Sequence, residues 1–165
     1  IDKDEPAIRY ADILLMYAEA LNELTTSYEV SSWDGIKAYT INRDPEEMRK
    51  GIKPVRMRAG VPDYDTPIYD NPAKFRIKLK RERQIELFAE GKRYYDLRRW
   101  KDVENTPEMI GDDYGMNSEG ITNETFFKRT VYQTRVWKRC YYWMPVFIDE
   151  YEKNPNLVQT PFWLE

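Results

Sequence analysis

The chain has 165 residues, of which 41% are hydrophobic and 15% aromatic, so we expect one ordered domain with one sizeable core. Histidine is absent and Cys140 is the only cysteine, which excludes serine triads with a histidine base, cysteine–histidine nucleophiles and nearly all zinc sites. A formal net charge of −3 gives the whole chain no attraction to a polyanion. Carboxylates remain the only obvious acid–base groups, and no apolar run of about 20 residues is present.

The first predicted element is a helix over residues 6 to about 24, which Asp4 or Glu5 caps and Pro6 opens. Its apolar stripe has helical spacing and consists of Ile8, Ala11, Leu14, Leu15, Ala18 and Leu21. The alanines leave little bulk on this helix, so we expect a neighbouring helix to approach it closely.

Residues 25–33 are predicted to form a polar loop. A second helix, capped by Ser32 or Asp34, is expected to run through Ile36, Tyr39 and Ile41.

A further helix is predicted to start at Asp44 and Pro45, since the first can cap it and the second fits the first helical position. Gly60 followed by Pro62 is typical of a helix end. The residues from there to Asp70 are interpreted as an ordered connector.

Residues 71–100 form the most distinctive stretch, because aromatic residues alternate with many cations. Asn71 and Pro72 predict a helix start, and Gly91 predicts either a kink or a second helix over residues 92–101. The expected core face of the long helix carries Ile77, Ile85, Phe88 and Tyr95.

Residues 105–123 are rich in glycine and poor in aliphatic side chains, so a long surface loop is expected there. Residues 126–137 have the composition of a strand, and residues 141–144 are its expected partner in a β-hairpin. One helical turn is predicted over residues 148–151. The predicted fold class is mainly α, with helix pairs that would suit a repeat of the tetratricopeptide kind.

Four stretches of this sequence resemble motifs of the C-terminal part of the SusD/RagB family of nutrient-binding outer-membrane lipoproteins. They are RYADILLMYAEALN at residues 9–22, VRMRAGVP at 55–62, ERQIELFAEGKRYYDLRRW at 82–100 and KNPNLVQTPFW at 153–163. Their order and spacing agree with the family along essentially the whole chain. Near the end, Thr160 and Phe162 replace the usual Asn and Gly.

The resemblance implies tetratricopeptide-like α/α helix pairs, long irregular loops and a short β-hairpin near the C-terminus. We expect one family domain over residues 1–165, with a helical scaffold over about 6–101 and a loop and hairpin region over about 102–165. It further implies a lipid-anchored protein at the cell surface of an outer membrane, whose anchor lies in a part absent from this chain. Such proteins work with a SusC-like TonB-dependent transporter and capture oligosaccharides, or sometimes peptides, without catalysis and without a cofactor or metal.

Carbohydrate sites use flat aromatic rings with neighbouring polar groups. The ligand-binding candidates outside the predicted helices are Tyr114, Asn117, Phe126 and Trp137. A second set of residues is predicted to form a structural salt-bridge network: Glu82, Arg83, Glu86, Arg93, Asp96 and Arg99.

Three other interpretations are open. The spacing of Glu82, Glu86 and Glu90 could place two carboxylates for glycoside hydrolysis, although nearby arginines favour ion pairs. The basic run over residues 74–83 resembles a nucleic-acid stripe, which the acidic pI and the interleaved acids disfavour. The chain could also be a purely structural helical scaffold.

Overall fold

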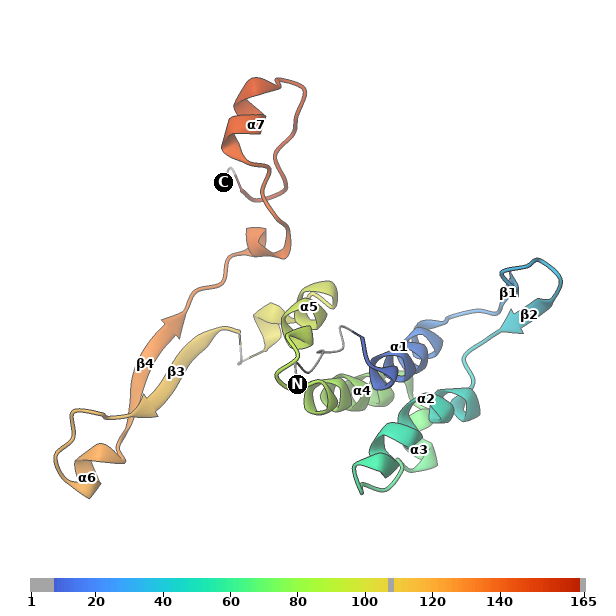
Figure 1. Cartoon of the computed structure of the whole chain (residues 1–165), viewed down its shortest axis with the longest axis horizontal. Helices are drawn as coiled ribbons and strands as arrows, with labels where there is room; N and C mark the ends of the chain where they lie inside the picture. The colour runs from blue at the N-terminus through green and yellow to red at the C-terminus, as the bar shows by residue number, and fades with distance from the viewer. Residues whose placement is uncertain (1–7, 107–108, 164–165) are drawn as a thin grey trace, which may run out of the picture. The chain divides into compact units, whose positions relative to one another are not determined.

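The structure is a computed structural model that describes residues 8–106 and 109–163. The chain divides into two compact units, Ile1–Arg93 and Tyr94–Glu165, here called the N-terminal and the C-terminal unit. The N-terminal unit contains α1 (Tyr10–Glu23), β1 (Tyr28–Ser31), β2 (Ala38–Ile41), α2 (Pro45–Arg58), α3 (Thr66–Tyr69) and α4 (Pro72–Glu86). Helix α5 (Lys92–Arg99) begins two residues before the boundary. The C-terminal unit continues with η1 (Val103–Asn105), β3 (Gly111–Met116), α6 (Asn123–Phe126), β4 (Arg129–Arg135), η2 (Arg139–Tyr142) and α7 (Ile148–Lys153) (Figure 1).

Local signals set the helix ends, as predicted. The side chain of Asp44 accepts a hydrogen bond from the backbone N–H of Glu46, and that of Asn71 accepts one from Lys74, each followed by a proline in the first turn. Helix α2 ends at Arg58, and Gly60, two residues further on, has a left-handed φ of +74°. Gly91, with a φ of +71°, separates α4 from α5, so the predicted second helix is present.

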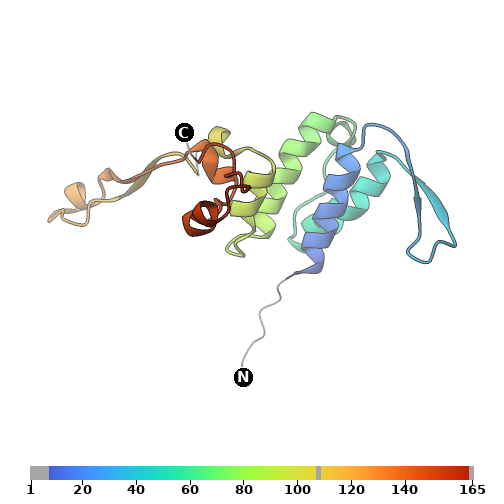
Figure 2. The ribbon, with the colours of Figure 1, turned by 90° about the horizontal axis from the view of Figure 1, so that it is seen from above.

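Helices α1, α2 and α4 pack side by side and form the core of the N-terminal unit (Figure 2). The buried core consists of Leu15, Ala18, Leu21, Met48, Ile52, Val55, Tyr69, Phe75 and Leu79. A Cβ atom on Gly51 of α2 would lie 2.6 Å from the carbonyl oxygen of Leu14 and 2.9 Å from the Cβ of Ala18. The predicted close approach to the small residues of α1 is therefore confirmed.

The start of α1 is only partly described. The helix begins at Tyr10, and its predicted caps Asp4 and Glu5, like Pro6, lie outside the described residues. None of the helices over residues 8–106 and 109–163 combines the length and the apolarity needed to cross a membrane.

The predicted second helix through Ile36 is wrong, because β1 and β2 form an antiparallel hairpin there, with Val30 opposite Tyr39. Gly35 makes the turn with a φ of +71°, and Asp34 accepts a hydrogen bond from the backbone N–H of Ile36 instead of capping a helix. Aromatic and β-branched side chains on both segments favour strands once a partner strand is available.

The predicted core face of α4 is also wrong. Ile77 is 69% exposed and Phe88 81% exposed, whereas Phe75, Leu79, Glu82 and Arg83 are buried. The buried positions follow the 3.6-residue period, but two of them are charged, because partners from other helices compensate their charges.

The predicted loop over residues 105–123 contains strand β3, which pairs with β4 in antiparallel register. Residues 141–144 are predicted to pair with residues 126–137, but this prediction is wrong. Residues 139–142 form the 3₁₀ helix η2 instead. Polar pairs stabilise the β3–β4 register: Asp113 pairs with Arg135, and the hydroxyl of Thr134 donates to Asp112 at 2.6 Å. Because these paired residues are polar, β3 lacks the alternation of apolar and polar residues by which a strand is predicted from sequence.

Candidate functional site

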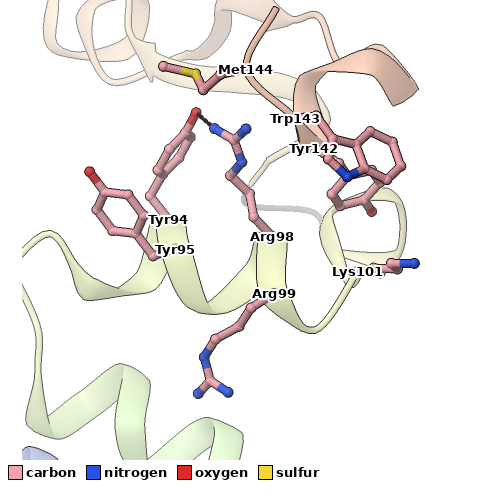
Figure 3. A pocket seen from close by; sticks show the side chains of 8 residues that line it. All are labelled: Tyr94, Tyr95, Arg98, Arg99, Lys101, Tyr142, Trp143 and Met144. Carbon is pink, nitrogen blue, oxygen red and sulfur yellow. Dashed lines mark hydrogen bonds between the residues drawn. The ribbon is translucent and has the colours of Figure 1, made fainter. Parts of the chain in front are cut away.

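A cavity of about 710 Å³ opens in the C-terminal unit beside α5. We call it the α5 pocket, and it is lined by Tyr94, Tyr95, Arg98, Arg99, Lys101, Tyr142, Trp143 and Met144. Figure 3 shows the side chain of Arg98 between Tyr94 on one side and the rings of Tyr142 and Trp143 on the other. The pocket therefore combines flat aromatic surfaces with a guanidinium group.

The wall formed by α5 follows from helical spacing. Tyr94 and Arg98 lie four residues apart and so share one helix face. Arg98 donates a hydrogen bond to the hydroxyl of Tyr94, and its guanidinium carbon lies 5.0 Å from the centre of that ring. The ring of Tyr95 meets that of Tyr94 edge to face, with the centroids 5.4 Å apart. These contacts hold Arg98 in an extended position.

The opposite wall belongs to a cluster of aromatic rings. Trp137 packs edge to face against Tyr142, with ring centroids 5.1 Å apart, and Trp143 packs against Phe162 at 5.8 Å. The indole N–H of Trp163 donates to the carbonyl of Trp143 at 3.3 Å. Ring packing restricts the rotamers of the two pocket residues Tyr142 and Trp143, and the hydrogen bond holds the backbone at Trp143.

Gln159 ties the last part of the chain to the segment after η2. Its amide oxygen accepts from the backbone N–H of Val146 at 2.8 Å, and its amide nitrogen donates to the carbonyl of Val146 at 2.9 Å. Phe162 has a φ of +66°, a left-handed conformation at the position where the family motif has glycine. The ring of Phe162 against Trp143 offsets part of this backbone cost.

Lys101 lies at the C-terminal end of α5, in a left-handed conformation with a φ of +55°. The backbone N–H of Asp102 donates to the carbonyl of Leu97 at 2.9 Å, and that of Lys101 donates to Arg98 at 3.1 Å. This pattern closes the helix in the way that usually uses glycine at this position. A lysine here projects an exposed ammonium group at the pocket rim.

The structure separates the four predicted ligand-binding residues. Tyr114 lies on β3, half exposed, with the guanidinium carbon of Arg129 3.8 Å from its ring centre. Asn117 follows β3, and its backbone N–H donates to the carbonyl of Phe126, the last residue of α6. These three thus lie on the segment from β3 to β4, whereas Trp137 belongs to the aromatic cluster behind the α5 pocket.

Three of the predicted network residues, Glu82, Arg83 and Glu86, are ion-paired with side chains far away in the sequence. Glu82 is buried and accepts from Arg56 at 2.6 Å and from the hydroxyl of Tyr64 at 2.9 Å. Burial, together with the charge of Glu82, raises the pKa of Tyr64 well above its ordinary value.

Glu86 pairs with Arg9 at 2.9 Å and with Arg58 at 2.6 Å. The hydrogen bonds from Arg9 to Glu90 and Glu86 raise the pKa of Arg9 further above its already high ordinary value. Ion pairs thus connect three of the four family-like stretches, through residues 9, 56, 58, 82, 86 and 90.

The other members of the predicted network are Arg83, Arg93, Asp96 and Arg99. Arg83 pairs with Asp12, and Arg93 is half-buried and engaged as well. In the C-terminal unit, the buried carboxylate of Asp96 accepts from Nε of Arg99 at 2.9 Å.

Comparison with known proteins places the chain in a family. The family model described as the SusD family matches residues 1–163, nearly the whole sequence. The chain belongs to the SusD family. A search of curated proteins found no match.

Solved SusD-like structures have the same fold. A structure of the protein BT4246 is 30% identical, with a TM-score of 0.69 over 98% of this chain. A SusD-like protein (BF3747) from Bacteroides fragilis NCTC 9343 is also 30% identical, with a TM-score of 0.67 over 95% of this chain. The chain spans about a quarter of the length of these proteins, because it covers 25% of each. The predicted mainly α, tetratricopeptide-like fold class is confirmed.

Members of the SusD family are cell-surface, outer-membrane lipoproteins that generally bind glycans and work with SusC-like transporters. The family is a binding family without catalysis. In this SusD-family chain, the α5 pocket has the surfaces that such binding needs, since rings can cover the apolar faces of sugars and Arg98 can bond their oxygens.

Sequence reasoning missed the pocket residues on α5. The pattern of residues 71–100 predicts a core face and a salt-bridge network. Glu82 and Arg83 are buried, but Tyr95, predicted on the core face, is exposed, and so is Tyr94. The signal was present in the four-residue spacing of Tyr94 and Arg98, a cation–aromatic pair on a helix.

Proposed function

We propose that this chain takes part in the non-catalytic capture of oligosaccharides at the outer-membrane surface. In this proposal the full-length protein is lipid-anchored and passes its ligand to a SusC-like TonB-dependent transporter. The family assignment supports the general activity. The α5 pocket carries the proposal for this chain, because Tyr94, Tyr142 and Trp143 offer ring surfaces beside the Arg98 guanidinium.

The size of the α5 pocket suits a short sugar segment. A volume of about 710 Å³ lies within the range of small-molecule sites. Tyr94 and Tyr95 are exposed, so a ligand reaches the rings without displacing a core residue. Since Trp137 packs on Tyr142, its role in binding is to position that ring.

The β3–α6–β4 segment supplies further contacts in this proposal. Tyr114 keeps half of its surface exposed while Arg129 stacks on it, and Phe126 is 38% exposed beside Phe127. The side chain of Asn117 accepts from the backbone of Glu119, so it orders the turn and contributes its amide N–H₂ to a ligand. An extended glycan would contact these residues in addition to the pocket.

Several contacts support a role without catalysis. Glycoside hydrolysis needs an acid and a second carboxylate at a shared cleft. Glu82, Glu86 and Glu90 instead pair with arginines, at distances of 2.6 to 2.9 Å. The lining of the α5 pocket includes neither Asp nor Glu.

The test is calorimetric titration of the full-length protein with a glycan panel and, in parallel, a peptide panel. We expect heat from at least one glycan, and a loss of affinity of about tenfold when Trp143→Ala removes one ring. Phe88→Ala, which removes an exposed ring outside both the pocket and the β3–α6–β4 segment, is the matched control. Heat from peptides alone would replace glycan capture with peptide capture, and heat from neither would leave the helical scaffold.

The transporter is tested separately. A SusC-like barrel encoded beside this protein is expected to co-purify with it from detergent-solubilised outer membranes. Recovery of the protein without any barrel transporter would contradict the proposed partner.

A further inference from the structure

The α5 pocket has an unbalanced charge. Arg98, Arg99 and Lys101 line it, and the other lining residues are neutral. A site for a neutral sugar has no need of three cations, because hydroxyl groups are bonded equally well by uncharged amides and hydroxyls. The excess of positive charge in the lining therefore favours a ligand with a negative charge.

Arg99 is the cation whose charge is compensated. Its Nε and Nη2 atoms each lie 2.9 Å from Oδ1 of the buried Asp96. Figure 3 shows its side chain extending from α5 away from Arg98. Arg99 therefore serves to hold α5 together and leaves the pocket charge to the other two cations.

Arg98 and Lys101 have no carboxylate partner within the part of the chain that the structure describes. Arg98 is half-buried, and its guanidinium donates to the phenol of Tyr94, which bonds the guanidinium without neutralising it. One terminal nitrogen of its guanidinium bonds Tyr94, and the other points away from that ring, toward the side of Tyr142 and Trp143 (Figure 3). A fork of this kind matches the geometry of a carboxylate or a sulfate.

The position of Lys101 adds a second observation. Its backbone is left-handed at a helix end, a conformation that favours glycine because glycine has no Cβ. The chain has a lysine side chain at this position despite that preference. The retained group is an ammonium at the rim of the pocket that already contains Arg98. Two cations and a ring-lined wall thus border one cavity, and Figure 3 shows the Lys101 side chain pointing away from Arg98.

We infer that the α5 pocket binds an anionic sugar unit, with its carboxylate or sulfate ester on Arg98 and its ring against Tyr142 and Trp143, while the flexible side chain of Lys101 adds positive charge at the rim. The inference rests on the proposed glycan capture and names the class of glycan. The two anionic groups share one chemistry, a planar or tetrahedral array of oxygen acceptors. Which of them is present is an outcome of the test.

The experiment uses the full-length protein and three probes of equal length: a tetragalacturonate, its fully methyl-esterified form and a sulfated galactose tetrasaccharide. The ester keeps the shape of the uronate but removes its charge. We expect one of the two acidic probes to bind about tenfold more tightly than the ester, since charge-assisted hydrogen bonds are the stronger ones. Raising the salt concentration should reduce this difference.

The variants Arg98→Gln and Lys101→Gln should each weaken the binding of the acidic probe by about five- to tenfold and leave the ester unchanged. Lys53→Gln is the matched control, because it removes the same charge from an exposed residue of α2, outside the pocket and outside the β3–α6–β4 segment. Lys101 is exposed, so its variant keeps the fold even if that of Arg98 does not.

Equal binding of acid and ester would overturn the inference and leave glycan capture standing. Acid-selective binding that neither variant changes would also overturn it for this pocket. Binding of no carbohydrate by the folded protein would instead contradict the proposed function. A preference for the sulfated probe over the uronate, lost in both variants, would support the inference and assign sulfate as the group.

Discussion

Asp12 and Arg83 form a buried ion pair, although 71 residues separate them in the sequence. Nη1 of Arg83 donates to Oδ1 of Asp12 at 2.9 Å, and the two side chains are only 4% and 6% exposed. Lys92 adds a second cation 3.4 Å from the other oxygen of Asp12. This cluster connects α1 with the end of α4, and it makes the two helices depend on each other.

Loss of the Asp12 charge should destabilise the protein strongly. Asp12→Asn leaves the buried Arg83 without its charged partner, and breaking a buried pair costs about 3 to 5 kcal/mol. Urea unfolding followed by circular dichroism measures the difference.

The control for this substitution is Glu23→Gln, which removes the same kind of charge from the pair with Arg76, whose side chains are 46% and 44% exposed. That change should cost about 1 kcal/mol or less. Similar losses in both variants would contradict a special role for the buried pair.

A side chain at Gly51 should push α1 and α2 apart. The first added carbon would lie 2.6 Å from the carbonyl oxygen of Leu14, which is backbone and cannot rotate away. Gly51→Ala is therefore expected to lower the unfolding free energy by about 1 to 3 kcal/mol, despite the better helix propensity of alanine.

Lys53→Ala, two residues further on the exposed side of α2, serves as the control for Gly51→Ala and should change stability by less than about 0.5 kcal/mol. A Gly51→Ala protein as stable as the parent would show that the helices can separate without cost.

Alkaline pH should destabilise the N-terminal unit through Tyr69. Burial, and the hydrogen bond from its hydroxyl to Asp63, raise the pKa of Tyr69 well above its ordinary value. The unfolded chain then loses this proton first, so the stabilisation is complete below about pH 10 and falls as the pH rises above it, by up to about 1.4 kcal/mol per pH unit.

The check is a series of urea unfolding curves from pH 8 to 11. Tyr69→Phe removes the hydrogen bond to Asp63, so it should lower the unfolding free energy by about 1 kcal/mol at pH 8. Above pH 10, the unfolding free energy of this variant should decline less steeply than that of the parent. Identical slopes for the parent and the variant would rule out Tyr69 as the responsible group.

Replacement of Lys101 by glycine should separate stability from binding. Lys101→Gly relieves a left-handed backbone, so the unfolding temperature should rise, by an amount equivalent to about 1 kcal/mol. Affinity for an acidic oligosaccharide should fall in the same variant, because the ammonium group is gone. Asp102→Gly, at the next position, is the control and should neither raise the unfolding temperature nor lower the affinity. A Lys101→Gly protein that gains stability and keeps its full affinity would show that Lys101 does not contribute to ligand binding.

The helix ends of this protein could be predicted because they depend on neighbours within a few residues. Asp44, Asn71, Gly60 and Gly91 each act through one turn of backbone, so their signals are readable in a string of letters. Family membership could be recognised for a similar reason, since each motif is a contiguous stretch.

Other features depend on side chains that the sequence places far apart. Glu82 and Arg83 face the core only because Arg56 and Asp12 meet them there, and β3 is a strand only because β4 pairs with it. The α5 pocket arises in the same way, from Arg98 on one helix and from Tyr142 and Trp143 some 40 residues later. Burial of a charge or pairing of an edge is favourable only when its distant partner is present, so tertiary structure decided these features.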